Sequence, residues 1–410
     1  MWARLGFQRG FDRDMKLLLG EMFSRRIVMG FLEVVRVIYF SMIGLSPVAT
    51  GFLITLGTIV SALESLFFGS LSDRYGRKPF LLIGSIFSVF RLVLYALSRD
   101  FWILAIAQGI GALGEGAGAG QPVVSGYISD KTKREDRSHI FSILAITNAL
   151  SATIGSLMAI LPAYFQLSPD LDEASSHIPL FWIGVAVNAL AVIILLPIKE
   201  ARERMRENDE GLRLSDVSWK DLCKYCIIRS TDGLGMGLVS PLLPLYFHLR
   251  FGAGSETLAP IYALGRFLPI FLYFSVPLFV DRFGNVKCLV ITRIVTGAVI
   301  AVFVLSPDFQ MATVLFVTYR LLFEFAMPMR QSFATEIVEP SQIGALVGVS
   351  NFTRSFIQSL APTIAGYLYE FVSLSIPFFS GAIILAVNGV QYHVFYRKKA
   401  GTTKQFFNTA

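Results

Sequence analysis

Residues 69–78 read G-S-L-S-D-R-Y-G-R-K and separate two long apolar stretches, 47–71 and 79–97. Each stretch is about long enough to cross the ~30 Å hydrocarbon core of a bilayer, so we expect two antiparallel membrane helices joined by a short charged hairpin. Gly69 permits close helix approach, and Gly76 lets the chain turn. Asp73 is placed to face the positive N-terminal end of a nearby helix. Three cations are expected to hold the hairpin on the cytoplasmic side: Arg74, Arg77 and Lys78.

The composition of the whole chain is that of a membrane protein. Of 410 residues, 54% are hydrophobic and 16% are charged, whereas an ordinary soluble domain has about 25% charged residues. The mean hydropathy is +0.61. Twelve spans of ~20 residues need about 240 residues, which leaves room for short loops, two tails and one linker. The lipid bilayer is therefore the first expected partner.

The distribution of positive charge predicts the orientation in the membrane. The formal net charge is +7, and lysines and arginines cluster in every second loop and in both tails. The loops between hold only Arg99 and Arg250. This alternation follows the positive-inside rule and predicts a multi-pass protein of the cell membrane with both termini in the cytoplasm. A nucleic-acid surface would not skip alternate loops, so no nucleic-acid partner is expected.

The apolar runs form two sets of six spans. We expect a cytoplasmic tail at 1–24, a six-helix bundle at 25–198, a cytoplasmic linker at 199–223, a second six-helix bundle at 224–396 and a tail at 397–410. The two sets resemble each other, because the D-R-x-G turn of the hairpin recurs in the second set as Asp281, Arg282 and Gly284. Six spans repeated in the same orientation predict two halves related by an axis along the membrane normal.

The hairpin resembles the loop between helices 2 and 3 of the major facilitator superfamily, G-x-L-x-D-R-x-G-R-K. The matching residues are Gly69, Leu71, Asp73, Arg74, Gly76, Arg77 and Lys78. The chain is similar to a multidrug or efflux-like member with twelve transmembrane helices. The resemblance implies an all-α fold of two pseudo-symmetric six-helix halves, in which helices 1, 4, 7 and 10 surround a central cavity. It also implies that the 2–3 and 8–9 hairpins gate the conformational change.

The sequence departs from the family at two places that bear on coupling. The helix 5 pattern of proton antiporters, G-x-x-x-G-P-x-x-G-G, survives only as Gly155 with Ser156 and Ala159. The arginine often found before the Gln108-Gly109 pair of helix 4 is replaced by Ala105. Both losses weaken an antiporter assignment.

Ionisable residues lie inside the predicted spans. A charged side chain facing lipid costs about 2.5–3.5 kcal/mol on an insertion scale, so these residues are expected to pair or to face water. On the helices that the resemblance places around the cavity, the candidates for the substrate or proton site are Glu33, Arg36, Glu115, Asp232, Arg320 and Glu324. Structural ion pairing is the alternative, since Glu33–Arg36, Arg229–Asp232 and Arg320–Glu324 are spaced as neighbours on one helix face.

Glu115 has no local cation and lies among glycines in the fourth span. An isolated carboxylate in a low-dielectric site can take and release a proton near neutral pH, so we expect Glu115 to carry a proton or bind substrate. The alternative is that Glu115 neutralises an arginine of another helix, such as Arg36 or Arg320.

Three functions remain open from the sequence. The first is a secondary transporter that exports a small amphipathic organic solute by alternating access, coupled to protons. The second is a facilitator or symporter of an organic anion, since arginines outnumber acids in the spans. The third is a non-transporting sensor. An enzyme is not expected, because the spans contain no nucleophile–base set and no metal cluster; neither a metal nor a cofactor is predicted, and a monomer is expected.

Overall fold

The computed structural model describes residues 12–112, 120–132, 137–167, 171–200, 218–338 and 342–396. Within these ranges the regular structure is helical and contains no strand. Eight helical stretches in the described part are long and apolar enough to cross a membrane, and Phe101–Ala112 is apolar but shorter. The expected all-α membrane fold is therefore confirmed.

The chain divides into two compact units. Unit 1 consists of Met1–Leu45, Leu53–Asp209 and Ala253–Ala263, and unit 2 consists of Ser46–Phe52, Glu210–Gly252 and Leu264–Ala410. Two short segments, Ser46–Phe52 and Ala253–Ala263, thus belong to a different unit from the residues that flank them in the sequence. The predicted division into tails, bundles and linker stays a prediction.

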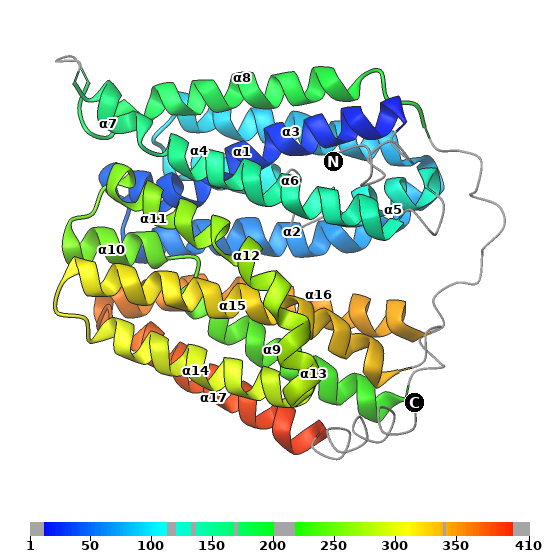
Figure 1. Ribbon diagram of the computed structural model, residues 1–410. Helices are drawn as coiled ribbons and strands as arrows, with labels where there is room; N and C mark the ends of the chain where they lie inside the picture. Colours follow the sequence, from blue (N-terminus) through cyan, green and yellow to red (C-terminus); the bar gives the residue numbers. More distant parts are fainter. Residues whose placement is uncertain are drawn as a thin grey trace, which may run out of the picture. The chain divides into compact units, whose positions relative to one another are not determined.

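Unit 1 is built around α8, against which the long helices α1 and α3 both pack. Its helices are α1 (Arg13–Met42), most of α2 (Pro47–Tyr75), α3 (Arg77–Leu97), α4 (Phe101–Ala112), α5 (Gly120–Lys131), α6 (Arg137–Met158), α7 (Leu161–Phe165), the 3₁₀ turn η2 (Ser175–His177) and α8 (Ile178–Leu195), with the start of α11 (Ser255–Phe267). Helix α1 packs against α6 and α8, and α3 packs against α8 and α4 (Figure 1). Helix α1 begins well before residue 25, where the first span was expected.

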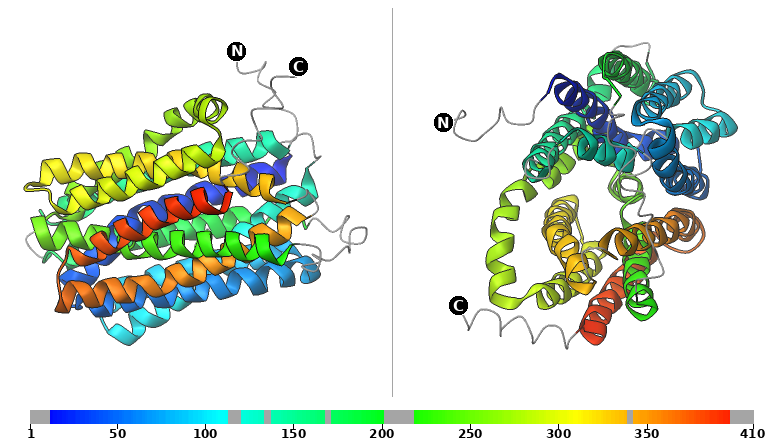
Figure 2. Two further views of the ribbon diagram at one scale, coloured as in Figure 1. Left: turned by 90° about the horizontal axis from the view of Figure 1, so that it is seen from below. Right: turned by 90° about the vertical axis from the view of Figure 1, so that its right-hand side faces the viewer.

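Unit 2 repeats this packing. Its helices are α9 (Trp219–Val239), α10 (Leu243–Phe251), the end of α11, α12 (Pro269–Leu272), the 3₁₀ turn η5 (Tyr273–Ser275), α13 (Val276–Phe283), α14 (Asn285–Val304), α15 (Phe309–Ile337), α16 (Ile343–Phe371) and α17 (Ile376–Tyr396). Helix α9 packs against α16 and α17, and α14 packs against α17 and α15. In both units the first long helix therefore packs against the fifth and sixth spans, and the third span packs against the sixth. The helices of both units are seen end on in the right panel of Figure 2. The internal repeat inferred from the D-R-x-G turns is present in the packing.

Glycines allow the central helices to approach closely. A Cβ added to Gly30 on α1 would lie 2.6 Å from the carbonyl oxygen of Ala152 on α6. A Cβ added to Gly233 on α9 would lie 2.5 Å from the carbonyl oxygen of Arg354 on α16. No other residue leaves room for the neighbouring backbone at these two points, as expected for small residues between membrane helices.

The motif at 69–78 is not a loop. Helix α2 continues to Tyr75 and α3 begins at Arg77, so Gly76 alone joins them. Gly76 has φ +102°, and Gly284 has φ +79° at the equivalent joint between α13 and α14. Because L side chains rarely adopt such angles, glycine is needed at both joints. The expected hairpin is therefore present, and its turn is Gly76 alone. Helices α2 and α3 both extend beyond the span ends expected at residues 71 and 79.

Two spans of the second set are divided into shorter helices. The seventh breaks between α9 and α10 at residues 240–242, and the eighth is divided into α11, α12, η5 and α13. Prolines stand near the start of α10, α12 and α13. Since proline lacks an N–H and favours the first turn of a helix, these breaks follow from proline placement.

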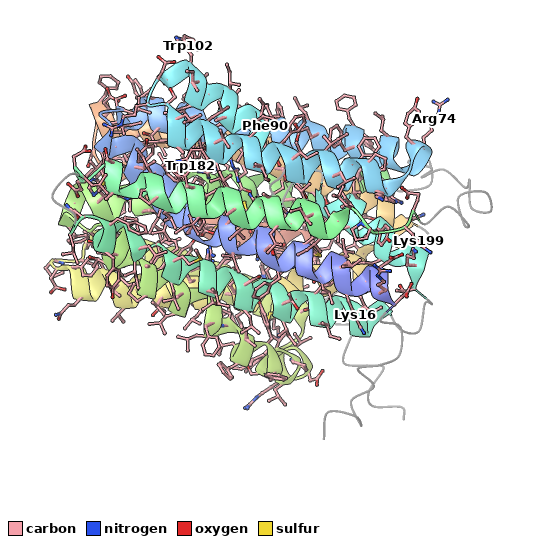
Figure 3. The ribbon with its side chains drawn as sticks, turned by 90° about the horizontal axis from the view of Figure 1, so that it is seen from above. Lys16, Arg74, Phe90, Trp102, Trp182 and Lys199 are labelled. Atoms are coloured by element: carbon pink, nitrogen blue, oxygen red, sulfur yellow. The ribbon has the colours of Figure 1, made fainter. Side chains whose placement is uncertain are left out.

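The outer surface of unit 1 is apolar along its length and cationic at one end. Figure 3 shows Lys16, Arg74 and Lys199 at one end of the helices and Trp102 at the opposite end. Trp102 is 70% exposed, and Phe90, at mid-length, is 53% exposed. Such residues suit a lipid-facing surface with an interfacial tryptophan. The cytoplasmic placement of the termini stays a prediction.

Candidate functional site

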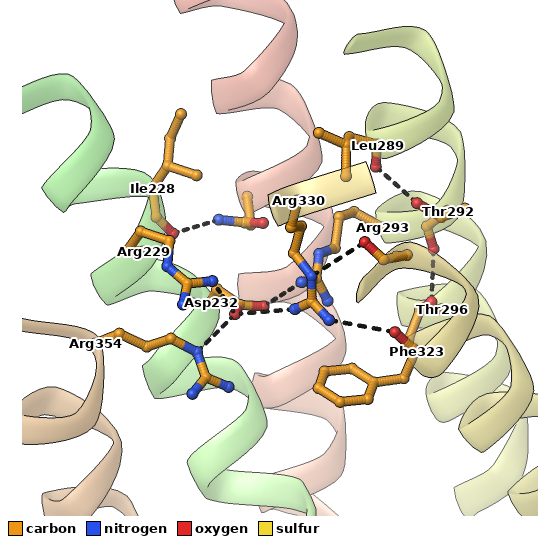
Figure 4. Close-up of polar contacts among 12 residues, drawn as sticks. Ile228, Arg229, Asp232, Leu289, Thr292, Arg293, Thr296, Phe323, Arg330 and Arg354 are labelled. Atoms are coloured by element: carbon orange, nitrogen blue, oxygen red, sulfur yellow. Dashed lines mark hydrogen bonds and ion pairs between the residues drawn. The ribbon is translucent and has the colours of Figure 1, made fainter. Parts of the chain in front are cut away.

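The most unusual polar cluster of the described residues lies inside unit 2 and centres on Asp232 of α9. Four guanidinium groups from four helices converge on this one carboxylate (Figure 4). The distances to Asp232 are 2.6 Å from Arg293 Nη2, 3.0 Å from Arg354 Nε, 3.3 Å from Arg330 Nη1 and 3.7 Å from Arg229 Nη1. We call these five residues the Asp232 cluster.

Helix packing explains how the cluster forms. Arg229 and Asp232 are three residues apart on α9, so they share one face of that helix. Gly233 lets the backbone of α16 lie directly on α9 at Arg354, which brings the Arg354 side chain to the carboxylate. Arg293 comes from α14 and Arg330 from α15. The cluster therefore joins the helices that correspond to the seventh, ninth, tenth and eleventh spans.

Two arginines of the cluster are almost fully buried. Helix α15 continues through Pro328 to Ile337 and buries Arg330, whose side chain is 4% exposed. Proline within a membrane helix is tolerated when neighbouring groups satisfy the freed backbone. The Arg330 Nη2 atom donates to the carbonyl oxygen of Phe323 on the same helix at 3.3 Å. Arg293 on α14 is the most buried arginine of the cluster, at 1% exposure.

The cluster carries an excess of positive charge. One carboxylate faces four guanidiniums, which stay protonated in proteins, so the formal sum is +3. Among the described residues no second carboxylate pairs with these four arginines. At about 2.5–3.5 kcal/mol for each membrane-embedded charge, three uncompensated charges would cost on the order of 8–10 kcal/mol. Some further negative group is needed to offset this cost.

Hydrogen-bond donors of the cluster remain unused. Arg293 Nε and Nη1 are buried without a hydrogen-bond partner among the described residues, as is Arg229 Nε. The Arg293 Nη2 atom and the Asp232 Oδ1 atom are close enough for an ion pair but are not aligned as a hydrogen bond. The Phe323 ring partly stabilises the positive charge of two of these arginines through cation–π contacts. The Arg330 guanidinium lies 4.7 Å and the Arg293 guanidinium 5.8 Å from the centroid of the ring. Buried donors without a protein partner require a water, an ion or another polar group to satisfy them.

A second expected pair is also present in unit 2. Arg320 Nη2 lies 3.6 Å from Glu324 Oε1, and the Tyr273 hydroxyl donates to Glu324 Oε2 at 3.2 Å. The side chains of Arg320 and Glu324 are 15% and 23% exposed. The two charges therefore compensate each other locally, in contrast to the Asp232 cluster.

In unit 1 the expected site residues are only partly brought together. Arg36 Nη1 donates to Gln108 Oε1 at 3.3 Å, and the Tyr95 hydroxyl donates to the same oxygen. Gln108 Nε2 in turn donates to the carbonyl oxygen of Leu53 at 3.2 Å. Glu33 lies on an exposed part of α1. Glu115 lies outside the described residues.

Unit 1 also buries an ionic group that the sequence reasoning missed. Glu21 of α1 is fully buried, accepts from Ser85 of α3 at 3.0 Å and pairs with Arg25 at 3.2 Å. These residues fell in or beside the segment expected to be a tail, although their i,i+4 spacing was visible in the sequence. The pair is balanced in charge.

The joint between α2 and α3 is closed by a residue assigned to the linker. The Glu200 carboxylate accepts from the backbone N–H groups of Arg77 at 2.8 Å and Lys78 at 2.9 Å. It thus neutralises the positive N-terminal end of α3. Lys78 Nζ also donates to the carbonyl oxygen of Leu196 at 2.7 Å, and Arg77 Nη1 to Ser72 Oγ at 3.0 Å.

The remaining gate candidates are less connected. Arg74 is exposed, with its guanidinium 5.8 Å from the centre of the Tyr75 ring. Asp281 and Arg282 are exposed at the second joint, where the Arg282 guanidinium lies 5.5 Å from the Phe283 ring centre. Gly69 and Asp73 lie within α2, and the Asp73 side chain lies outside the described part of the chain.

The chemistry available at these sites is binding. Within the described ranges no group of three or more His, Cys, Asp or Glu residues could hold a metal ion. Guanidinium groups bind carboxylates and phosphates through paired N–H donors and do not themselves transfer protons. The Asp232 cluster is thus suited to hold an anionic group.

Comparisons with known proteins agree with this architecture. The profile described as Major Facilitator Superfamily matches residues 18–362 and 225–408. The chain is 21% identical over 376 residues to "Quinolone resistance protein NorA" of Staphylococcus aureus (strain MRSA252), covering 90% of this chain and 92% of the relative. It is 22% identical over 411 residues to "Multidrug resistance protein MdtH" of Proteus mirabilis (strain HI4320), covering 94% and 95%. Its fold is similar to the crystal structure of nucleoside transporter NupG, with a TM-score of 0.76 at 14% identity and coverage of 94% and 99%.

Proposed function

This chain belongs to the major facilitator superfamily of membrane transporters, and from that premise we propose that it exports a small amphipathic organic solute by alternating access, coupled to protons. Its fold and family are those of transporters rather than enzymes. The proposal specifies the solute class, direction and coupling.

The observation that carries the proposal is similarity along the full chain to drug-resistance transporters. NorA and MdtH are each matched over nine-tenths or more of both lengths. The shared part therefore includes both sets of helices rather than one motif. Their names describe resistance to quinolones and to multiple drugs, which favours an organic solute and export for this chain as well.

The joints at Gly76 and Gly284 support a role in the conformational change. Gly76 joins two long helices, and Gly284 joins the eight-residue α13 to the long helix α14, each through one residue. We expect each joined pair to move together. We assign the gate to the two joints: Gly69, Asp73, Arg74, Gly76, Arg77 and Lys78 at the first, Asp281, Arg282 and Gly284 at the second. Glu200 holds the first joint closed through the N-terminus of α3.

Glu115 remains the proposed proton carrier, since it lies among glycines in the fourth span and has no charged sequence neighbour. Glu33, Arg36, Arg320 and Glu324 complete the proposed substrate and proton site. A facilitator or symporter of an organic anion is the second candidate function, favoured by the +3 charge of the Asp232 cluster.

Proteoliposomes test the proposal. The purified protein is reconstituted with an amphipathic fluorescent solute, and its movement is followed with and without an imposed pH gradient. Proton-coupled export predicts movement against the solute gradient only when protons can move the opposite way. Equal movement with and without the pH gradient would refute proton coupling. Absence of movement for a panel of such solutes, in vesicles containing folded protein, would refute transport of this class.

A further inference from the structure

We propose that the Asp232 cluster is a binding site for the anionic group of the transported solute, held by Arg229, Arg293, Arg330 and Arg354. The inference rests on the proposed transport function and names the chemical class of its solute, an organic carboxylate. It also assigns the binding of that group to arginines of α9, α14, α15 and α16 around one of the candidates inferred from the sequence, Asp232.

The first argument is charge. The cluster has four guanidiniums and one carboxylate. Each guanidinium has a nitrogen within 3.7 Å of a carboxylate oxygen of Asp232. The Arg320–Glu324 and Glu21–Arg25 pairs of the same chain are each neutral. A bound anion would reduce the excess of positive charge at the Asp232 cluster.

The second argument is the set of unused donors. Arg293 is 1% exposed, and its Nε and Nη1 atoms have no hydrogen-bond partner among the described residues. Arg354 donates to Asp232 through Nε, so its terminal nitrogens point away from the carboxylate in Figure 4. Paired terminal N–H groups of arginine match the two oxygens of a carboxylate. Arg293 and Arg354 therefore both have N–H groups that Asp232 does not use.

The third argument is access. Arg293 and Arg330 are almost completely buried, at 1% and 4% exposure, whereas Arg229 and Arg354 are 14% and 20% exposed. The cluster is thus closed on one side and reachable on the other. A site with one open side suits an anionic group attached to a larger body, since only the charged end has to enter.

Asp232 then acts as a resident competitor. It holds the arginines together when no solute is present, and an incoming carboxylate shares or displaces its contacts. Removal of the Asp232 charge is expected to strengthen anion binding.

A thermal unfolding titration of the purified full-length protein tests the site. Sodium benzoate is the probe, benzamide is its uncharged counterpart, and sodium chloride at matched concentration controls for a simple inorganic anion. We expect benzoate to raise the unfolding midpoint in a saturable way and benzamide to have no effect. The apparent dissociation constant for benzoate is expected to rise about tenfold or more in Arg293→Gln and to fall in Asp232→Asn.

Matched variants keep the test decisive. Arg250→Gln removes an arginine of unit 2 outside the cluster and should leave the benzoate constant unchanged. If Arg293→Gln does not fold, Arg354→Gln replaces it, because Arg354 is the most exposed of the four. Equal effects of benzoate and benzamide, or unchanged benzoate binding in the cluster variant, would overturn the proposal. So would full stabilisation by sodium chloride with no further effect of benzoate, since the cluster would then hold an inorganic ion.

Flux in proteoliposomes separates this proposal from the transport function. If Arg293→Gln or Arg354→Gln binds no benzoate yet transports solute at the wild-type rate, the assigned site is wrong and the transport function stands. If benzoate binds at the cluster but the protein moves no solute, the transport function fails and the proposal that the site serves a transported solute fails with it, although an anion site remains.

Discussion

Substitution of Gly76 by alanine tests how the joint between α2 and α3 is held. Gly76 has φ +102° and ψ 154°, a backbone conformation essentially restricted to glycine, which costs an L residue about 1–3 kcal/mol. A Cβ at this position would also lie 2.8 Å from Glu200 Oε2. The carboxylate has to move, which weakens its two hydrogen bonds to the N-terminus of α3.

Gly284→Ala is the matched control. Gly284 has φ +79° and ψ 153° at the equivalent joint, but a Cβ there would meet nothing within 4 Å. Gly284→Ala should therefore cost the backbone strain alone. Hydrogen bonds to a charged group contribute about 1.5–3 kcal/mol when buried, and these are only partly buried, so Gly76→Ala should destabilise by about 1–2 kcal/mol more than Gly284→Ala.

The measurement is the free energy of unfolding of each purified variant in detergent, from denaturant titration followed by helix content. The difference should disappear when both glycine variants are made in a Glu200→Ala background, because the displaced carboxylate is then absent. Equal destabilisation by the two glycine substitutions in the wild-type background would show that Glu200 does not close the joint, and our account of it would be refuted.

Three further predictions concern the charged sites. Asp232→Ala should destabilise the protein by about 3–5 kcal/mol in low-salt buffer, because it leaves four buried arginines without their carboxylate; a change below 1 kcal/mol in thermal or denaturant unfolding would contradict this. Glu324→Gln should cost at most about 1 kcal/mol in the same assay, because its pair with Arg320 is balanced and partly exposed; a loss as large as that of Asp232→Ala would show the pair to be essential. Glu115→Gln should abolish proton-coupled movement in proteoliposomes while the unfolding midpoint stays unchanged, and coupled transport at the wild-type rate would exclude Glu115 as the proton carrier.

The sequence predicted the membrane helices and their repetition well, because both depend on local signals. Apolar runs of sufficient length define spans, and the D-R-x-G turns at Asp73 and Asp281 identified the repeat. Helix ends were less accurate. Polar residues near Gly76 suggested a loop. The backbone of α2 stays helical through these polar residues to Tyr75 and ends at Gly76, which has a positive φ.

The Asp232 cluster could be predicted only in part. Spacing along α9 revealed the Arg229–Asp232 pair, because i,i+3 neighbours share a face. The contacts of Asp232 with Arg293 and Arg354 depend on how α14 and α16 rotate and how closely they approach at Gly233, and one sequence does not contain that information. The burial of Arg330 depends in addition on α15 continuing through Pro328 to Ile337.

The position of Glu200 has a practical consequence for engineering this chain. The carboxylate that fastens α3 is followed directly by the mixed-charge segment between the two sets of spans. A fluorescent or affinity module inserted several residues after Glu200 leaves that fastening untouched. A deletion that removes Glu200, or a protease site placed at Glu200, would break its hydrogen bonds to α3. Insertions should therefore begin beyond this residue.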